Sequence, residues 1–232
     1  FDNKVMTWYE PGPDPTQPWI QHKIGVDGQP GVNRFSHGLG VGDINGDGHP
    51  DVITTEGYYE APADPRTGPW KFIPMKLGPE CAQMQVYDVN KDGLADIVSS
   101  SSHNIGIWWH EQKKGANGME FERHLIDDSF SQSHSLVMAD INKDGAMDFV
   151  TGKRFWAHGP TGDVNPSDPA VIYWYELKRK AGTVEFIRHQ VDNDSGVGTQ
   201  FQVIDVNKDG LLDIVTANKK GVFVFLQERH KK

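Results

Sequence analysis

The sequence predicts an all-β protein, a β-propeller of four-stranded antiparallel blades with about four to five blades in the chain. A nine-residue motif, Asp-x-Asn-x-Asp-Gly-x-x-Asp, occurs four times along the 232 residues. Its copies start at Asp43, Asp88, Asp140 and Asp205, and these steps suit blades of about 40–50 residues. Apolar stretches that alternate with period two flank every copy, which indicates strands rather than helices.

Each repeat contains up to four expected strands in order, and four antiparallel strands per unit are typical of a propeller blade. The first strand precedes the motif and the second follows it. The third strand is aromatic in the first three repeats: Tyr58–Glu60, Trp108–Glu111 and Tyr173–Glu176. The fourth strands are expected within residues 70–77, 121–126 and 186–191.

We interpret residues 1–232 as a single β-propeller domain or a fragment of one. Residues 1–24 form a partial blade, 37–77, 82–127 and 133–191 form full blades, and 198–227 form a last blade with three strands. This assignment predicts seventeen strands. It leaves two arrangements open: the chain belongs to a larger ring, such as a seven-bladed one, or the N-terminal strand completes the last blade.

The four loops offer the hard oxygen ligands that calcium prefers. Positions 1, 3, 5 and 9 supply three aspartates and an asparagine, position 7 offers its backbone carbonyl, and glycine at position 6 allows a sharp turn. We therefore expect four structural Ca²⁺ sites. Their ligands are Asp43, Asn45, Asp47, His49 and Asp51; Asp88, Asn90, Asp92, Leu94 and Asp96; Asp140, Asn142, Asp144, Ala146 and Asp148; and Asp205, Asn207, Asp209, Leu211 and Asp213.

These loops differ from EF-hands and from ordinary turns. A helix-loop-helix EF-hand needs Glu at position 12, where this chain has Thr54, Ser99, Thr151 and Thr216. Metal-free Asp/Asn-Gly turns would explain the centre of the motif. They would not explain a fourth carboxylate-type position repeated four times, so we favour metal, and calcium over magnesium because the ligands are many and flexible.

The charge distribution supports bound cations. The chain has 32 acidic and 23 basic residues and a net charge of −9. Twelve of the acids lie in the four loops, and without them the balance would be slightly positive. No basic stripe indicates nucleic acid, and no apolar run is long enough for membrane insertion.

The loops and their spacing resemble the calcium-binding propellers of the FG-GAP and VCBS repeat families, which include integrin α-subunit heads and a fungal lectin. The Phe-Gly cassette of integrin repeats is absent, and His37 to Gly40 and Ala82 to Gln85 stand in its place. The segment from His37 through the first loop to Tyr58–Glu60 is similar to the propeller of fungal aldos-2-ulose dehydratase and its bacterial relatives. That resemblance implies lyase chemistry on keto-sugars.

Strand order places all calcium loops at one end of the propeller. The starts of the first strands and the connections between second and third strands lie at the other end, which we call the upper rim. This rim collects nine candidate residues: His37, Gln83, His103, His134, Lys153, Arg154, Trp156, His158 and Gln200. An insertion in the third repeat, Gly152 to Ala170, is expected to form a lip over it. Convergent polar groups in a concave place favour a ligand site.

Three functions are compatible with this rim. In the first, it binds a carbohydrate or polyol, with lyase activity as a further option, a class that the dehydratase resemblance supports. Elimination next to a sugar ketone needs a base and an electrophile, for which the candidates are His37 or His134 as the base and Lys153 or Arg154 to stabilise an enolate. The remaining candidates would then contact the ligand. The second is a noncatalytic lectin or an adhesion and interaction module. The third is a transition metal held by His37, His103 and His134, which we favour least because equal spacing around a ring would hold them too far apart.

We expect the protein to be secreted or periplasmic, because calcium sites of this kind fill most easily at millimolar extracellular calcium. The export signal would then lie upstream of Phe1. The expected partners are the carbohydrate or polyol ligand and further blades or domains of the same protein.

Overall fold

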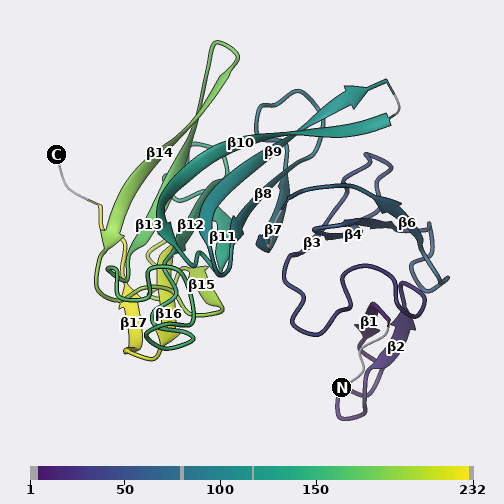
Figure 1. The fold of residues 1–232 in the computed structure, drawn as a ribbon, viewed down its shortest axis with the longest axis horizontal. Helices are drawn as coiled ribbons and strands as arrows, with labels where there is room; N and C mark the ends of the chain where they lie inside the picture. The colour runs from purple at the N-terminus through teal and green to yellow at the C-terminus, as the bar shows by residue number, and fades with distance from the viewer. Residues whose placement is uncertain (1–4, 79–80, 117, 230–232) are drawn as a thin grey trace.

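The computed structural model describes residues 5–78, 81–116 and 118–229, and it is all-β (Figure 1). The described residues contain seventeen strands, the number that the repeat predicts. No helix of this part of the chain is long and apolar enough to cross a bilayer. The strands are β1 (Thr7–Glu10), β2 (Ile20–Lys23), β3 (Leu39–Gly42), β4 (Asp51–Thr54), β5 (Gly57–Glu60), β6 (Lys71–Pro74), β7 (Cys81–Tyr87), β8 (Asp96–Ser101), β9 (Ile105–Gly115), β10 (Gly118–Ser131), β11 (Leu136–Ala139), β12 (Asp148–Gly152), β13 (Ile172–Lys180), β14 (Thr183–Asp192), β15 (Phe201–Ile204), β16 (Asp213–Asn218) and β17 (Gly221–Phe225).

The strands form antiparallel meanders in chain order, as propeller blades do. Strands β11–β14 make one four-stranded sheet, β15–β17 a three-stranded sheet and β1–β2 a two-stranded sheet. The meanders β3–β6 and β7–β10 are joined edge to edge through a parallel pairing of β3 with β7. Figure 1 shows the sheets as an open arc, with β1–β2 at one end and β15–β17 at the other.

Glycines in β3 allow the close approach of two innermost strands. A Cβ atom on Gly40 would lie 2.6 Å from the backbone oxygen of Met84, and one on Gly42 would lie 2.6 Å from Cβ of Val86. Real Cβ atoms do not approach other atoms so closely, so a side chain at either position would push β3 away from β7. The alternating glycines after His37 therefore serve the packing of the first two complete blades.

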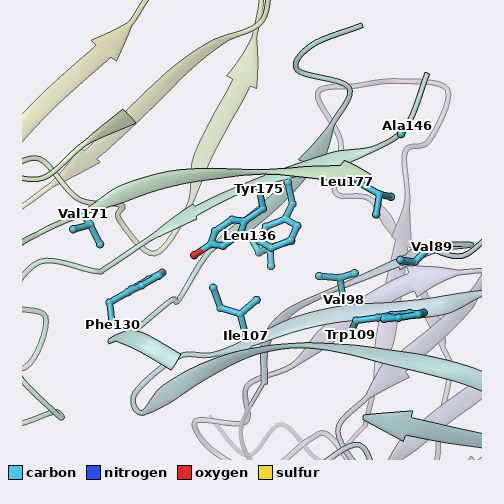
Figure 2. Close-up of a cluster of buried hydrophobic side chains, with 11 residues drawn as sticks. Val89, Val98, Ile107, Trp109, Phe130, Leu136, Ala146, Val171, Tyr175 and Leu177 are labelled. Atoms are coloured by element: carbon cyan, nitrogen blue, oxygen red, sulfur yellow. The ribbon is translucent and has the colours of Figure 1, made fainter. Parts of the chain in front are cut away.

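Buried apolar side chains lie between neighbouring sheets. Figure 2 shows the largest such cluster, where Val98, Ile107 and Trp109 of β8 and β9 face Leu136 and Tyr175 of β11 and β13. Three further clusters occupy the equivalent places between the other neighbours, around Ile97, Ile214 and Tyr59. Each sheet is therefore held by the faces it shares with the next, which is the packing of a β-propeller.

The two ends of the arc do not pair with each other. Within the described residues, β1 pairs with β2 and β17 pairs with β16. The N-terminal strand does not complete the last sheet, so the ring closure left open by the sequence is not observed. Val222 and Val224 of β17 are exposed, as is Leu226 just after it, so this end of the arc presents apolar side chains to solvent.

A stacked Trp and His ties the outermost strand to the third strand in three of the units. In the β7–β10 blade the rings of Trp109 and His124 stack at 4.6 Å, and Nε2 of His124 lies 2.9 Å from Oε2 of Glu111. The other carboxylate oxygen of Glu111 accepts a hydrogen bond from the loop residue Asn90. The same stacks with a glutamate partner are Trp8–His22–Glu10 and Trp174–His189–Glu176. These histidines serve the scaffold of the blade.

Candidate functional site

The four motif loops share one backbone conformation at the lower end of the blades. The glycine at position 6 has φ between 83° and 88° in all four loops. Position 4 is also left-handed, with φ of 78° at Gly46 and 60–63° at Lys91, Lys143 and Lys208. A residue with a side chain is disfavoured in this region, which explains the invariable glycine at position 6. The left-handed position 4 was not expected from the sequence.

Backbone N–H groups hold the side chains of positions 1, 3 and 5. In the second loop, Asp88 accepts hydrogen bonds from the backbone N–H groups of Asp92 (3.1 Å) and Gly93 (3.0 Å). Asn90 Oδ1 accepts from the N–H of Asp92, and Asp92 Oδ1 accepts from that of Leu94. The other three loops repeat this pattern. The carboxylates are thus oriented by the turn itself.

The aspartate at position 9 is buried in every loop and has a role of its own. Asp96 Oδ2 accepts a hydrogen bond from the N–H of Val89 (3.0 Å), and its Oδ1 accepts from the N–H of Gln112 (2.8 Å). Asp51, Asp148 and Asp213 make the equivalent pairs. Burial raises the pKa of Asp96 to about 6 despite these bonds. These hydrogen bonds explain why aspartate recurs at position 9 without requiring a metal, a role that could not be seen in the sequence.

The loop residues nonetheless fit calcium. Each loop presents three aspartates and an asparagine, all of them hard oxygen donors. Among the ion pairs of residues 5–78, 81–116 and 118–229, the only one that reaches a loop aspartate joins Lys178 to Asp144 at 3.2 Å. The loop charges are therefore largely without cationic side-chain partners, and the four calcium sites stay a prediction.

At the upper rim, three histidines from different parts of the chain meet. His37 precedes β3, His134 precedes β11 and His103 lies in the connection between β8 and β9. Nε2 of His37 lies 3.1 Å from Nε2 of His103 and 3.2 Å from Nε2 of His134. The expectation that ring spacing keeps these side chains apart is wrong. It assumed evenly spaced inner strands, but β3 pairs directly with β7, and the His37 ring lies within 3.2 Å of both other rings.

Asp163 of the third-repeat insertion connects two histidines. Its carboxylate lies 2.9 Å from Nδ1 of His103 and 2.9 Å from Nδ1 of His158, whose rings stack at 5.0 Å. Arg154 Nη2 lies 3.8 Å from Asp163 Oδ2 and 3.3 Å from Nδ1 of His103. Burial acts to raise the pKa of Asp163, but the hydrogen bonds from both histidines lower it overall. The sequence marked the insertion, yet it did not single out Asp163.

The insertion lies over the rim as the predicted lip. Its Val164 carbonyl accepts hydrogen bonds from Ser131 Oγ (2.7 Å) and Gln132 Nε2 (3.0 Å), both at the end of β10 or just after it. These bonds join the third repeat to the second. They bring Asp163 and His158 over the β8–β9 connection.

His134 is uncharged at neutral pH. Burial, then the charge of Arg154 and the neighbouring His37 and His103, lower the pKa of His134 to about 4. Burial also lowers the pKa of Arg154. The rim thus combines a neutral imidazole with a partly buried guanidinium whose charge is opposed by Asp163.

The two predicted glutamines form a second pair at the rim. Gln83 Nε2 donates to Gln200 Oε1 at 3.3 Å, so side chains of the second and fourth repeats meet. Gln83 Oε1 accepts from Ser135 Oγ and from the backbone N–H of Leu136. The Gln83 amide thus joins the second repeat to both the third and the fourth, and Gln200 is left exposed.

Lys153 and Trp156 stand apart from this cluster. The Lys153 ammonium is buried and donates to Ser131 Oγ at 2.7 Å, and burial lowers its pKa. Trp156 is exposed, and its carbonyl accepts a hydrogen bond from Lys219. Neither side chain has a described interaction with His37, so the predicted rim set is brought together only in part.

Two cavities, of about 550 and 1190 Å³, lie elsewhere, beside β1–β2. The larger is lined by residues that include Tyr9, Lys23 and Arg34 and ends at Phe35 and Ser36, immediately before His37. Neither cavity contains the residues of the predicted rim pocket. Both clefts adjoin the two-stranded sheet β1–β2 at the open end of the arc. We therefore base the functional assignment on the convergent histidines of the upper rim rather than on these clefts.

The blade packing and the lower loops define a β-propeller built from loop-bearing repeats. Two of its segments are similar to FG-GAP repeats: a model for FG-GAP-like repeats matches residues 88–151, and one for FG-GAP repeats matches residues 35–64. No curated protein sequence matches the chain.

One solved structure with this fold comes from Agrocybe aegerita. It is a lectin described by its specific recognition of non-reducing terminal N-acetylglucosamine. The TM-score is 0.54 at 16% identity, and the match covers 89% of this chain. The chain spans about half of the lectin, with 54% of that chain covered. At this identity the likeness concerns the fold.

Proposed function

We propose that the protein is a calcium-stabilised β-propeller that binds a carbohydrate or polyol at the upper rim, opposite the calcium loops. The observation that supports this most is the convergence of His37, His103, His134, Arg154 and Asp163, which come from three different repeats. FG-GAP repeats and a lectin with the same fold fit a carbohydrate-binding or interaction module.

The chemistry of the rim suits hydroxyl groups. A polyol presents hydroxyls that both donate and accept hydrogen bonds, and it needs both kinds of partner. Arg154 only donates, Asp163 only accepts, and the exposed Gln200 amide does both. The exposed Trp156 adds an apolar ring near the edge of the lip.

Binding to a panel of sugars, polyols and glycans ending in N-acetylglucosamine tests this proposal. We expect the His37→Ala variant to bind at least about tenfold more weakly, because His37 is half-buried and the loss of a hydrogen-bond partner there costs about 1–3 kcal/mol once the ligand covers it. The matched control is His189→Gln, which changes a scaffold histidine in β14 and keeps a hydrogen-bond donor for Glu176. Isothermal titration calorimetry provides the affinities. If His37→Ala bound the ligand with unchanged affinity, the upper rim would not be the ligand site.

We also propose that this rim can catalyse elimination from a keto-sugar. His134 is neutral and close enough to Arg154 to respond to its charge. An imidazole nitrogen would take the proton next to the ketone, and the electron pair would form an enolate beside Arg154. The enolate would then return to the ketone and form a C=C bond as the β-hydroxyl, protonated by the imidazolium, leaves as water. Turnover that is lost in His134→Ala with sugar binding retained would favour this enzyme over the alternative, a noncatalytic lectin or interaction module.

We propose further that the protein works outside the cytoplasm and with additional blades. Millimolar calcium would fill the loops there. The exposed apolar residues of β17 and the partial coverage of the lectin support additional blades of the same protein. Fractionation of the source cells checks the location, and a protein confined to the cytoplasm would contradict it.

A further inference from the structure

We infer that His37, His103 and His134 form a binding site for a divalent transition metal, with Zn²⁺ the best-suited ion. The site lies at the rim where we propose ligand binding, but metal binding does not depend on a sugar. A His134 ring that holds a metal cannot also act as the base proposed above, so elimination by that base belongs to the metal-free rim. The Nε2 atom of His37 is 3.1 Å and 3.2 Å from the other two Nε2 atoms, and a ligand atom from each ring lies within 4.8 Å of the others.

Hydrogen bonds on the far side of two rings determine which nitrogen faces the cluster. Nδ1 of His37 lies 2.7 Å from the carbonyl oxygen of Phe35. Nδ1 of His103 lies 2.9 Å from the Asp163 carboxylate. Carbonyl and carboxylate oxygens only accept, so the Phe35 carbonyl and the Asp163 carboxylate each favour a hydrogen on Nδ1, and a neutral ring in that tautomer directs a bare Nε2 lone pair inward. At His103 the Asp163 carboxylate, at 2.9 Å from Nδ1, is closer than the Arg154 guanidinium, which lies 3.3 Å from the same nitrogen and can only donate. Two such lone pairs 3.1 Å apart repel each other unless a proton or a cation lies between them.

This arrangement is that of metal-ligating histidines. Such histidines typically donate their other ring N–H to a carboxylate or a backbone carbonyl, which orients the ring and fixes its tautomer. Asp163 provides the carboxylate, and its side chain is only 4% exposed. Phe35 provides the carbonyl from a left-handed backbone (φ 67°) although its own ring is exposed. Strained conformations of this kind concentrate at functional sites.

The distances suit a small ion with nitrogen ligands. A tetrahedral zinc ion with Zn–N bonds of about 2.0–2.1 Å holds its ligand nitrogens about 3.3–3.4 Å apart. The two shortest separations are slightly below this value. Imidazole favours zinc, copper and nickel, whereas calcium and magnesium favour oxygen. Three histidines also leave a fourth tetrahedral position open for water or a ligand hydroxyl.

The local charge is compatible with a cation. Arg154 approaches His103 from the Nδ1 side and opposes a second positive charge. Asp163 lies against both groups and offsets that charge.

The test measures metal binding to the calcium-loaded protein without any sugar. Zn²⁺ titration in competition with a chromophoric chelator should show one site, and Co²⁺ should give the intense visible bands of tetrahedral nitrogen ligation. We expect His103→Ala and His134→Ala to weaken zinc binding at least about 100-fold and Asp163→Asn to weaken it about 10–100-fold. His189→Gln should bind like the unchanged protein.

A neighbouring set of ligands provides the competing explanation. His158 also contacts Asp163, so His103, His158 and Asp163 form an overlapping cluster. If His158→Ala abolished zinc binding and His134→Ala left it intact, the proposed site would be wrong. Weak, nonsaturating uptake, or octahedral Co²⁺ bands from the unchanged protein, would overturn it without any variant. A zinc site with no glycan binding would refute only the proposed function, and the reverse result would refute only the metal.

Discussion

We expect chelation of calcium to lower the melting temperature of this protein by at least about 10 °C, and calcium added in excess to restore it. A ligand present at 100 times its dissociation constant stabilises the folded state by about 2.7 kcal/mol per site. For a chain of this size, 1 kcal/mol corresponds to about 2–4 °C. Four filled loops would thus contribute tens of degrees, since each otherwise crowds three aspartates with few cationic partners. Differential scanning calorimetry with and without a chelator measures the effect.

The control separates calcium from other metals. A chelator also removes zinc, so calcium alone must restore the transition in the chelated sample. A melting curve that does not move in excess chelator would mean that the loops fold as hydrogen-bonded turns and hold no stabilising ion.

Replacement of the buried ninth aspartate is the second large effect that we expect. Asp96→Ala leaves the N–H groups of Val89 and Gln112 buried without acceptors. Each unsatisfied buried group costs about 1–3 kcal/mol, so the melting temperature should fall by roughly 5–20 °C. Asp96→Asn keeps one oxygen acceptor and should cost less. Thermal melts followed by circular dichroism provide the comparison.

The matched variant is Asp92→Ala in the same loop, where the side chain is exposed. In calcium, both variants should lose stability. In chelator, the penalty of Asp92→Ala should largely disappear while that of Asp96→Ala persists. Asp96 accepts hydrogen bonds from two buried backbone N–H groups, whereas Asp92 accepts from the N–H of Leu94 at an exposed position where water can replace it. Equal penalties in chelator would show that position 9 has no role beyond that of position 5.

The fold could be predicted because its determinants are local and repeated. Loop motifs of nine residues and the alternating apolar stretches around them place each first and second strand. The stack of Trp109 on His124 likewise follows from positions that recur in the repeat. The number of motif copies, with up to four strands in each repeat, then predicts the number of strands without any knowledge of long-range contacts.

The upper rim could be predicted only as a list of polar residues at one end. Which of them meet depends on how far the inner strands lie apart, and β3 pairs with β7 through glycines whose role is visible only in three dimensions. Asp163 lies in an insertion that no other repeat shares. Lys153 is placed at the rim by strand order, yet it turns inward to Ser131.

The contact between His37 and His134, like that between Gln83 and Gln200, joins repeats that are not neighbours in the chain. A single unit therefore contains everything needed to build a lower loop, but no single unit contains the chemistry of the upper rim. Duplication of a repeat would copy a lower loop, but it could not copy the arrangement of side chains at the upper rim. The lower end can stay uniform while the upper end diversifies, and a new specificity can arise by substitution at a few strand starts without disturbing the units that carry them.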